Sequence, residues 1–221
     1  MINYKNLSII GTSHIAAESV IEVGTFILKE RPAIVALELD KRRAYSMLNA
    51  EKKLSIKDIK HLGIRIFIVN LIGSWVEKKL GERVGIKPGS EMKRAVECAR
   101  TADSKVILID QDIKITLRNL VKTPVLEVIK VIFDSIFGFI FRKDAVRIDL
   151  TKVPKKVLIN KILKLVKKRY PYIHKVLIDD RNKIMAKRII KIMEIYEKEK
   201  ILAVVGAGHE DEIAKMVKNE I

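Results

Sequence analysis

The stretch Ile201-Leu-Ala-Val-Val-Gly206-Ala-Gly-His209 joins a short apolar run to a glycine-containing turn and a histidine. Near the N-terminus, Leu7-Ser-Ile-Ile-Gly11-Thr-Ser-His14 has the same order. Short runs rich in Val and Ile are typical of parallel strands that helices cover on both faces. We therefore predict that both stretches are parallel strands and that each strand ends in a Gly-x-x-His turn.

Two more runs of this kind occur at residues 33–39 and 106–109. The intervening segments read as helical at residues 16–30, 55–80 and 90–102, whereas residues 116–200 contain no convincing strand. Strands that alternate with helices predict an α/β fold. We expect one domain over residues 1–221, with a mostly parallel central sheet flanked by helices and a large all-helical insertion, residues 116–200, before the last strand.

Composition excludes several classes of protein. With 221 residues, 48% hydrophobic and 32% charged, the chain is long and apolar enough to bury a core. No uncharged apolar run approaches the ~20 residues of a membrane span, and the N-terminus does not resemble a signal peptide. The single cysteine, Cys98, excludes an internal disulfide and a cysteine-based zinc cluster. We therefore expect a soluble, cytoplasmic protein.

The net charge of +17 raises the question of nucleic-acid binding. The lysines are spread along the chain and alternate with glutamates, a pattern that suits the solvated surface of a thermophilic protein. Aromatic residues make up only 5%, so stacking platforms for bases are scarce. We do not expect nucleic acid to be the main ligand.

Each predicted strand is followed by a histidine or a carboxylate. Ligands of open α/β sheets bind at the carboxyl ends of the strands, so these side chains are expected to meet. Two imidazoles with Glu38 or Asp40 form a set suited to a divalent ion such as Mn, Co, Fe or Zn. In the alternative interpretation, the glycine turns cradle a phosphate and the histidines only cap helices. The residues concerned are His14, Glu38, Asp40, Asp110, Asp112 and His209.

Other polar residues carry weaker signals. Glu91 heads the helix at 90–102, where it is either functional or an ordinary acid favoured by the helix dipole. Arg43 either orients Glu38, binds a substrate carboxylate or is a surface charge. The two remaining histidines, His61 and His174, are expected at the surface.

A helix opened by Pro124 has a narrow polar stripe of Glu127, Lys130, Asp134 and Gly138, and the rest of it is apolar. So broad an apolar face is expected in the core or in a homodimer formed through residues 124–141. If exposed, it would form a groove or a membrane-surface element, and the basic helix at 154–169 could then lie on anionic lipid.

Taken in order, six motifs resemble the TraB/PrgY family. They are Gly11-Thr-Ser-His14; Glu38-Leu-Asp40-x-x-Arg43; Glu91-Met-Lys93; Asp110-x-Asp112-Ile113 with Thr116, Leu117 and Arg118; Asp180-Arg181-x-x-x-Met185-Ala186; and Gly206-Ala-Gly-His209. The family is similar to the Tiki metalloproteases and, more distantly, to erythromycin-esterase-like and ChaN-like haem-binding proteins. The resemblance implies an α/β fold with both Gly-x-x-His motifs in one site and Mn- or Co-dependent peptidase chemistry. Bacterial members are linked to the shutdown of peptide sex pheromones, and many relatives continue into C-terminal membrane helices.

On this basis we expect a metal-dependent hydrolase, most plausibly a metallopeptidase acting on peptides. His14, Glu38 and His209 would hold the metal, with Glu91 as general base; which glutamate is ligand and which is base stays open. Arg43, Arg118 and Arg181 would bind an oxyanion or a substrate carboxylate, and Asp40, Asp110, Asp112 and Asp180 are further candidates. The alternative is a non-enzymatic protein of the same fold that sequesters a peptide, binds a membrane surface or binds haem.

The sequence departs from the family pattern at two positions. Gln111 stands where the pattern has Arg in Asp-Arg-Asp, and Asn182 stands where it has the second Asp of Glu-Arg-Asp, whose first acid is here Asp180. We expect these changes to alter the charge and reach of the site, and with them its choice of substrate and its activity.

Overall fold

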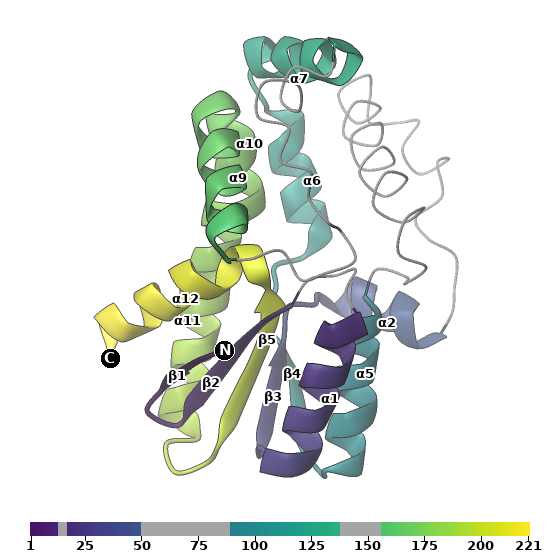
Figure 1. Cartoon of the computed structure of the whole chain (residues 1–221), viewed down its shortest axis with the longest axis vertical. Coiled ribbons are helices and arrows are strands. Elements are labelled where there is room, and N and C mark those ends of the chain that lie inside the picture. The colour runs from purple at the N-terminus through teal and green to yellow at the C-terminus, as the bar shows by residue number, and fades with distance from the viewer. Residues whose placement is uncertain (13–16, 50–88, 138–155) are drawn as a thin grey trace.

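The computed structural model describes residues 1–12, 17–49, 89–137 and 156–221. Its centre is a five-stranded sheet in the order β1-β2-β5-β3-β4 (Figure 1). The strands are β1 (Ile2–Tyr4), β2 (Leu7–Thr12), β3 (Ile34–Leu37), β4 (Lys105–Leu108) and β5 (Ile201–Gly206). All neighbours are parallel except β1, which pairs with β2 antiparallel. The predicted α/β fold with a mostly parallel sheet is confirmed.

The last of these strands in sequence lies at the centre of the sheet. β5 pairs with β2 on one side, where Thr12 lies opposite Gly206, and with β3 on the other, where Leu37 lies opposite Val204. Every residue of β5 is buried. This register places the carboxyl ends of β2, β3 and β5 side by side along one edge of the sheet, the edge at which the parallel strands end.

Helices cover both faces of the sheet (Figure 1). On one face, α1 (Ala17–Glu30) and α5 (Ser90–Thr101) bury Val23, Ile27 and Ala95 against Val35 and Leu202. On the other, α11 (Asp180–Ile195) and α12 (Ala207–Glu220) form a second core cluster, which includes Met185, Ile189, Ile213, Ala203 and Val205. The sheet is therefore a middle layer, as the unbroken apolar runs predict.

A block of helices stands over the carboxyl ends of the strands (Figure 1). It contains α6 (Ile113–Val121), α7 (Val125–Phe137), α9 (Lys156–Arg169), α10 (Pro171–His174) and the π-helical turn η2 (Lys175–Asp179), which continues into α11. Between β4 and β5 the described residues form helices and no strand. None of the described helices is both long enough and apolar enough to cross a membrane.

Several details differ from the sequence prediction. β1 and α2 (Lys41–Asn49) are additional elements, and the helical block begins at Ile113 rather than at Thr116. The predicted helix at 55–80 lies outside the described residues. His174, predicted at the surface, is buried, and its Nδ1 lies 3.3 Å from Asp179 Oδ2. His174 lies in α10, which packs against both α9 and η2.

Helix α7 departs from the usual amphipathic arrangement. Its polar residues Glu127 and Asp134 are buried, whereas Leu126 and Ile129 are exposed. The expectation that the broad apolar face lies in the core of the chain is therefore wrong for the part of α7 that the structure describes. Buried partners for the two carboxylates, described below, explain this orientation.

Candidate functional site

Arg181, in the first turn of α11, is the centre of the polar cluster at the carboxyl ends of the strands. Its Nη2 donates to Glu38 Oε1 and, at 2.8 Å, to Asp110 Oδ2, and its Nε donates to Asp110 Oδ1 at 3.0 Å. Burial alone would lower the pKa of Arg181, but Glu38 and Asp110 outweigh it and raise that pKa above its usual value. The guanidinium is therefore a permanent buried cation held by two carboxylates.

Glu38 joins two neighbouring strands at this edge. It follows β3, its backbone N–H donates to Val204 O at 3.0 Å, and its Oε2 accepts a hydrogen bond from Gly206 N at 2.5 Å. Only 3% of the residue is exposed. Because the backbone of β5 holds Oε2, the carboxylate directs Oε1 toward Arg181 and His209.

His209 lies in the first turn of α12, directly after the Gly206 turn. Its Nδ1 is 2.6 Å from Asn182 Oδ1, and its Nε2 is 3.2 Å from Arg181 Nη1 and 3.5 Å from Glu38 Oε1. The amide oxygen of Asn182 only accepts, so Nδ1 carries the proton, and Nε2 faces the guanidinium donor with its lone pair. The contact with Asn182 thus orients the ring, with Nε2 toward Arg181 and Glu38.

Further groups surround Asp110. Arg43 Nη1 lies 3.5 Å from Asp110 Oδ2, and Arg188 Nη1 donates to Asp110 O. Gln111, at the position of the family's arginine, donates from Nε2 to Thr116 Oγ1 at 2.7 Å. Asp110 therefore receives two guanidinium contacts on its carboxylate and one on its carbonyl.

Asp40 caps helix α2 and lies beside this group. Its Oδ1 accepts hydrogen bonds from Arg42 N at 2.8 Å and Arg43 N at 3.1 Å. Its Oδ2 is buried and has no hydrogen-bond partner among the described residues. The cap holds the start of α2, and hence Arg43, over the edge of the sheet.

The other predicted site residues lie apart from the Arg181 contacts. Asp112 caps α6 by accepting from Lys114 N at 2.8 Å, and Asp180 pairs with Lys175 Nζ at 2.8 Å, which raises the pKa of that lysine. Arg118 is exposed on α6. Glu91 is buried in the first turn of α5, at the sheet edge where the strands end. His14 falls in residues 13–16, outside the described part of the chain.

Two participants were not found from the sequence. Arg188 lies seven residues after Arg181 on the same helix, a spacing that places both on one face, and this spacing could have revealed it. The π-helical turn η2 ends at Asp179, two residues before Arg181, whose Nη1 also donates to Leu177 O within that turn at 3.2 Å. Such turns are frequent at functional sites, but no sequence pattern predicts them.

Among the described residues, no three His, Cys, Asp or Glu side chains form a group disposed to hold a metal ion. Glu38, Asp110 and His209 are all present, but Arg181 lies between them and bonds to each. His14 lies outside the described residues. Within the cluster, Glu38 and His209 are two potential metal ligands whose ligand atoms, Oε1 and Nε2, lie 3.5 Å apart.

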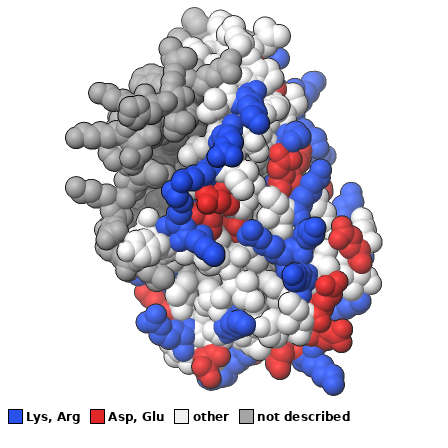
Figure 2. Space-filling model, turned by 180° about the vertical axis from the view of Figure 1, so that it is seen from behind, with Lys and Arg blue, Asp and Glu red and all other residues white. Residues whose placement is uncertain are grey.

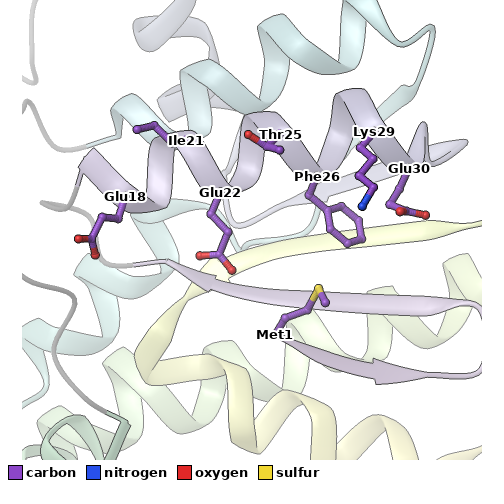
Figure 3. A pocket seen from close by; sticks show the side chains of 8 residues that line it. All are labelled: Met1, Glu18, Ile21, Glu22, Thr25, Phe26, Lys29 and Glu30. Atoms are coloured by element: carbon purple, nitrogen blue, oxygen red, sulfur yellow. The ribbon is translucent and has the colours of Figure 1, made fainter.

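A separate hollow of about 610 Å³ opens between α1 and the start of the chain (Figure 3). Met1, Ile21 and Phe26 form its apolar lining, and Glu18, Glu22 and Lys29 lie around it. None of its lining residues belongs to the predicted site, so the hollow is distinct from the Arg181 cluster.

Fold and site together define an α/β protein with carboxylates, a guanidinium and an imidazole converging where the parallel strands end. The sequence pattern of the TraB/PrgY/gumN family matches residues 2–218. The chain belongs to the TraB/PrgY/gumN family. It is also similar to the uncharacterized protein MJ1365 of Methanocaldococcus jannaschii, with 36% identity over 223 residues, covering 98% of this chain and 54% of that protein. The chain thus spans about half the length of this curated relative.

Proposed function

We propose that this protein is a metal-dependent hydrolase that cleaves peptides at the carboxyl edge of its sheet. Glu38, His209 and His14 would hold a divalent ion, with Mn or Co favoured and Zn as a further candidate. The single observation that supports this assignment is the paired arrangement of Glu38 and His209, two residues 171 positions apart in the sequence.

The two potential ligands fit one ion. A metal with ligands at about 2.1 Å and tetrahedral angles separates two ligand atoms by roughly 3.4 Å. His209 Nε2 and Glu38 Oε1 are 3.5 Å apart. Asn182 also holds the proton on Nδ1, which is the outer hydrogen bond that metal-bound histidines usually make. Spacing and tautomer therefore both suit ligation.

Arg181 stands against this fit in one respect. Its guanidinium bonds to the same two atoms, so both hydrogen bonds must be released for the pair to ligate. Its two bonds to Asp110 do not involve those atoms and can remain. Arg181 would then stay beside the reacting group as a fixed positive charge.

The residues divide the chemistry of hydrolysis among them. When bound, a divalent ion supplies a water of lowered pKa and polarises a carbonyl. Glu91, a buried carboxylate at the same edge, would accept a proton from the attacking water. Arg181 would stabilise negative charge on the carbonyl oxygen, and Arg43 would hold a carboxylate of the peptide.

Metal content measured by elemental mass spectrometry tests the proposal. The wild type, His14→Ala, His209→Ala and Glu38→Gln would be loaded with Mn, Co or Zn and desalted. We expect near-stoichiometric metal in the wild type and less than a tenth of it in each variant. The matched control is Glu22→Gln, at an exposed position of α1 that makes no contact with the Arg181 cluster.

Uptake that is the same in the wild type and both histidine variants would overturn the metal assignment. If metal binds as expected, a library of quenched fluorescent peptides tests hydrolysis. Cleavage that disappears in Glu91→Gln while metal content persists supports the assigned base. Stoichiometric metal with no cleavage of any peptide would favour a protein that sequesters peptides.

A further inference from the structure

We propose that α7 docks on the surface of an anionic membrane, with its exposed apolar face at the lipid interface. This inference is independent of the hydrolase proposal, because α7 contributes nothing to the Arg181 cluster. It rests on three observations: an exposed apolar face, a locked opposite face and a surrounding surface of one charge.

The apolar face is large and continuous. Val125, Leu126, Ile129 and Ile132 are 57%, 72%, 55% and 38% exposed, and their spacing places them on one side of the helix. Singly exposed apolar residues are ordinary, but four on one helix face mark an interaction surface. Helix α7 crosses the end of the helical block that is farthest from the sheet, so this face lies at the periphery (Figure 1).

The opposite face is fixed by buried carboxylates. Glu127 accepts from Tyr172 N at 2.9 Å and Ile173 N at 3.2 Å, at the start of α10. Asp134 accepts from Arg169 Nε and Nη2 at 2.5 and 2.6 Å and from the Tyr170 hydroxyl. Turning α7 to bury its apolar face would break all of these bonds. The exposure of that face is therefore built into the fold.

The charge around α7 is positive. Lys114, Arg118 and Lys122 are exposed at intervals of four residues along α6 up to its C-cap, and Lys130 is exposed on α7 itself. Lys167 and Lys168 are exposed in the last turn of α9, next to the Arg169 that binds α7. In Figure 2, lysine and arginine side chains form a line on the surface that runs toward the end of the molecule at which α7 lies.

No carboxylate is exposed on the described parts of α6, α7 and α9. α6 and α9 contain no Asp or Glu, and both acids of α7 are buried. A second copy of the chain would bring the same lysines to the contact and be repelled. An apolar face beside exposed lysines instead complements anionic headgroups over acyl chains. Charge thus selects an anionic membrane surface over a homodimer.

Vesicle co-sedimentation tests the proposal. Wild-type protein would be mixed with vesicles of phosphatidylcholine alone, or with about one third phosphatidylserine, at low and high NaCl. We expect binding to the anionic vesicles that weakens with salt, and little binding to the neutral ones. The double variant Leu126→Ser/Ile129→Ser should bind roughly tenfold more weakly, because two apolar side chains no longer enter the interface.

The matched control is Ile21→Ser/Ile195→Ser, which removes two equally exposed apolar side chains elsewhere, 67% and 62% exposed. It should bind like the wild type. Equal binding by all three proteins, or none to anionic vesicles, would overturn the proposal. A dimer in light scattering that Leu126→Ser/Ile129→Ser dissociates, without vesicle binding, would show that a second copy covers the face. Circular dichroism confirms that each variant is folded.

Discussion

At the scale of single residues, Arg181 compensates the charge of the carboxylates that end two strands. Glu38 and Asp110 are buried, with 3% and 5% of their surface exposed, and the guanidinium of Arg181 bonds to both. Replacing Arg181 with Gln should lower the free energy of unfolding by about 3–5 kcal/mol, because it leaves buried carboxylates without a counter-charge. Urea denaturation measures this, with the exposed Arg94→Gln as control.

The same variant separates two views of the cluster. If Glu38 and His209 ligate a metal, Mn should raise the unfolding midpoint of Arg181→Gln more than that of the wild type, because no guanidinium has to be displaced. An equal effect of Mn on both proteins would contradict the metal site while leaving the ion-pair account intact.

Asn182 fixes the imidazole of His209. Asn182→Leu keeps the volume but removes the hydrogen bond to Nδ1, so we expect metal affinity to fall about 10–100-fold. Isothermal titration measures it. Asn160→Leu, at an exposed site on α9 with one 3.4 Å contact to Asp211, is the matched control and should retain wild-type affinity.

Gly11, the glycine of the first Gly-x-x-His motif, is required by packing. A Cβ there would lie 2.8 Å from Oε2 and 3.0 Å from Cβ of the buried Glu210. Gly11→Ala should cost about 1–3 kcal/mol of stability. Gly208→Ala, whose Cβ would meet Leu163 at an ordinary 3.7 Å, should be neutral or stabilise α12 by up to about 1 kcal/mol. Thermal unfolding of both variants measures whether Gly11→Ala lowers the stability while Gly208→Ala leaves it unchanged or raises it.

The sequence predicts which acids follow the strands, because parallel strands bring their carboxyl ends to one edge. It does not predict the central position of Arg181, since an Asp-Arg pair in a helix has the same pattern when it is solvated. Asp180 and Arg181 indeed diverge: Asp180 pairs with Lys175, and Arg181 enters the cluster. Adjacent residues of a helix point about 100° apart, and which of the two faces the cluster depends on how α11 packs, which composition does not encode.

At the scale of elements, α7 shows what hydrophobic periodicity leaves open. The sequence identifies the helix and its narrow polar stripe correctly, and the usual rule assigns the apolar side to the core. Its two carboxylates, Glu127 and Asp134, instead face inward, because Arg169, Tyr170 and the N–H groups at the start of α10 bind them. These partners lie 35 to 46 residues away in sequence, so no local pattern reports them.

The Asp134 contacts, which hold α7 against the rest of the chain, predict how the free energy of unfolding depends on pH. The hydrogen bond from Arg169 holds the pKa of Asp134 below its ordinary value of 3.8. The folded state therefore resists protonation more than the unfolded state. The contribution of Asp134 to stability is complete above pH 3.8 and is lost progressively as pH falls from there through the lower pKa of the folded state. Asp134→Asn should cost about 1–3 kcal/mol at pH 7, with the difference from wild type shrinking below pH ~4.

Urea unfolding at several pH values measures that difference, and Glu212→Gln, an exposed site on α12, is the control and should show no such pH-dependent difference. If the difference in the free energy of unfolding between Asp134→Asn and the wild type stays constant from pH 7 to pH 3, the assigned role of the carboxylate is contradicted.

At the scale of the whole molecule, the sheet depends on its last strand in sequence. β5 lies between β2 and β3 and hydrogen-bonds to both. A chain ending at Lys200 should lack cooperative thermal unfolding, because two central strands lose their only common neighbour. A chain ending at Lys218 loses only exposed residues and should unfold like the full chain. Circular dichroism compares the two, and a cooperative transition in the shorter chain would contradict this.

The central position of β5 also fixes the order in which the protein can mature during synthesis. The strand that closes the sheet carries Gly206, whose N–H holds Glu38, and leads directly to His209. A nascent chain that has not yet produced these residues has Glu38, Asp110 and Arg181 but lacks His209 and the Gly206 N–H that holds Glu38. Closure of the sheet and assembly of the Arg181 cluster therefore depend on the same last strand.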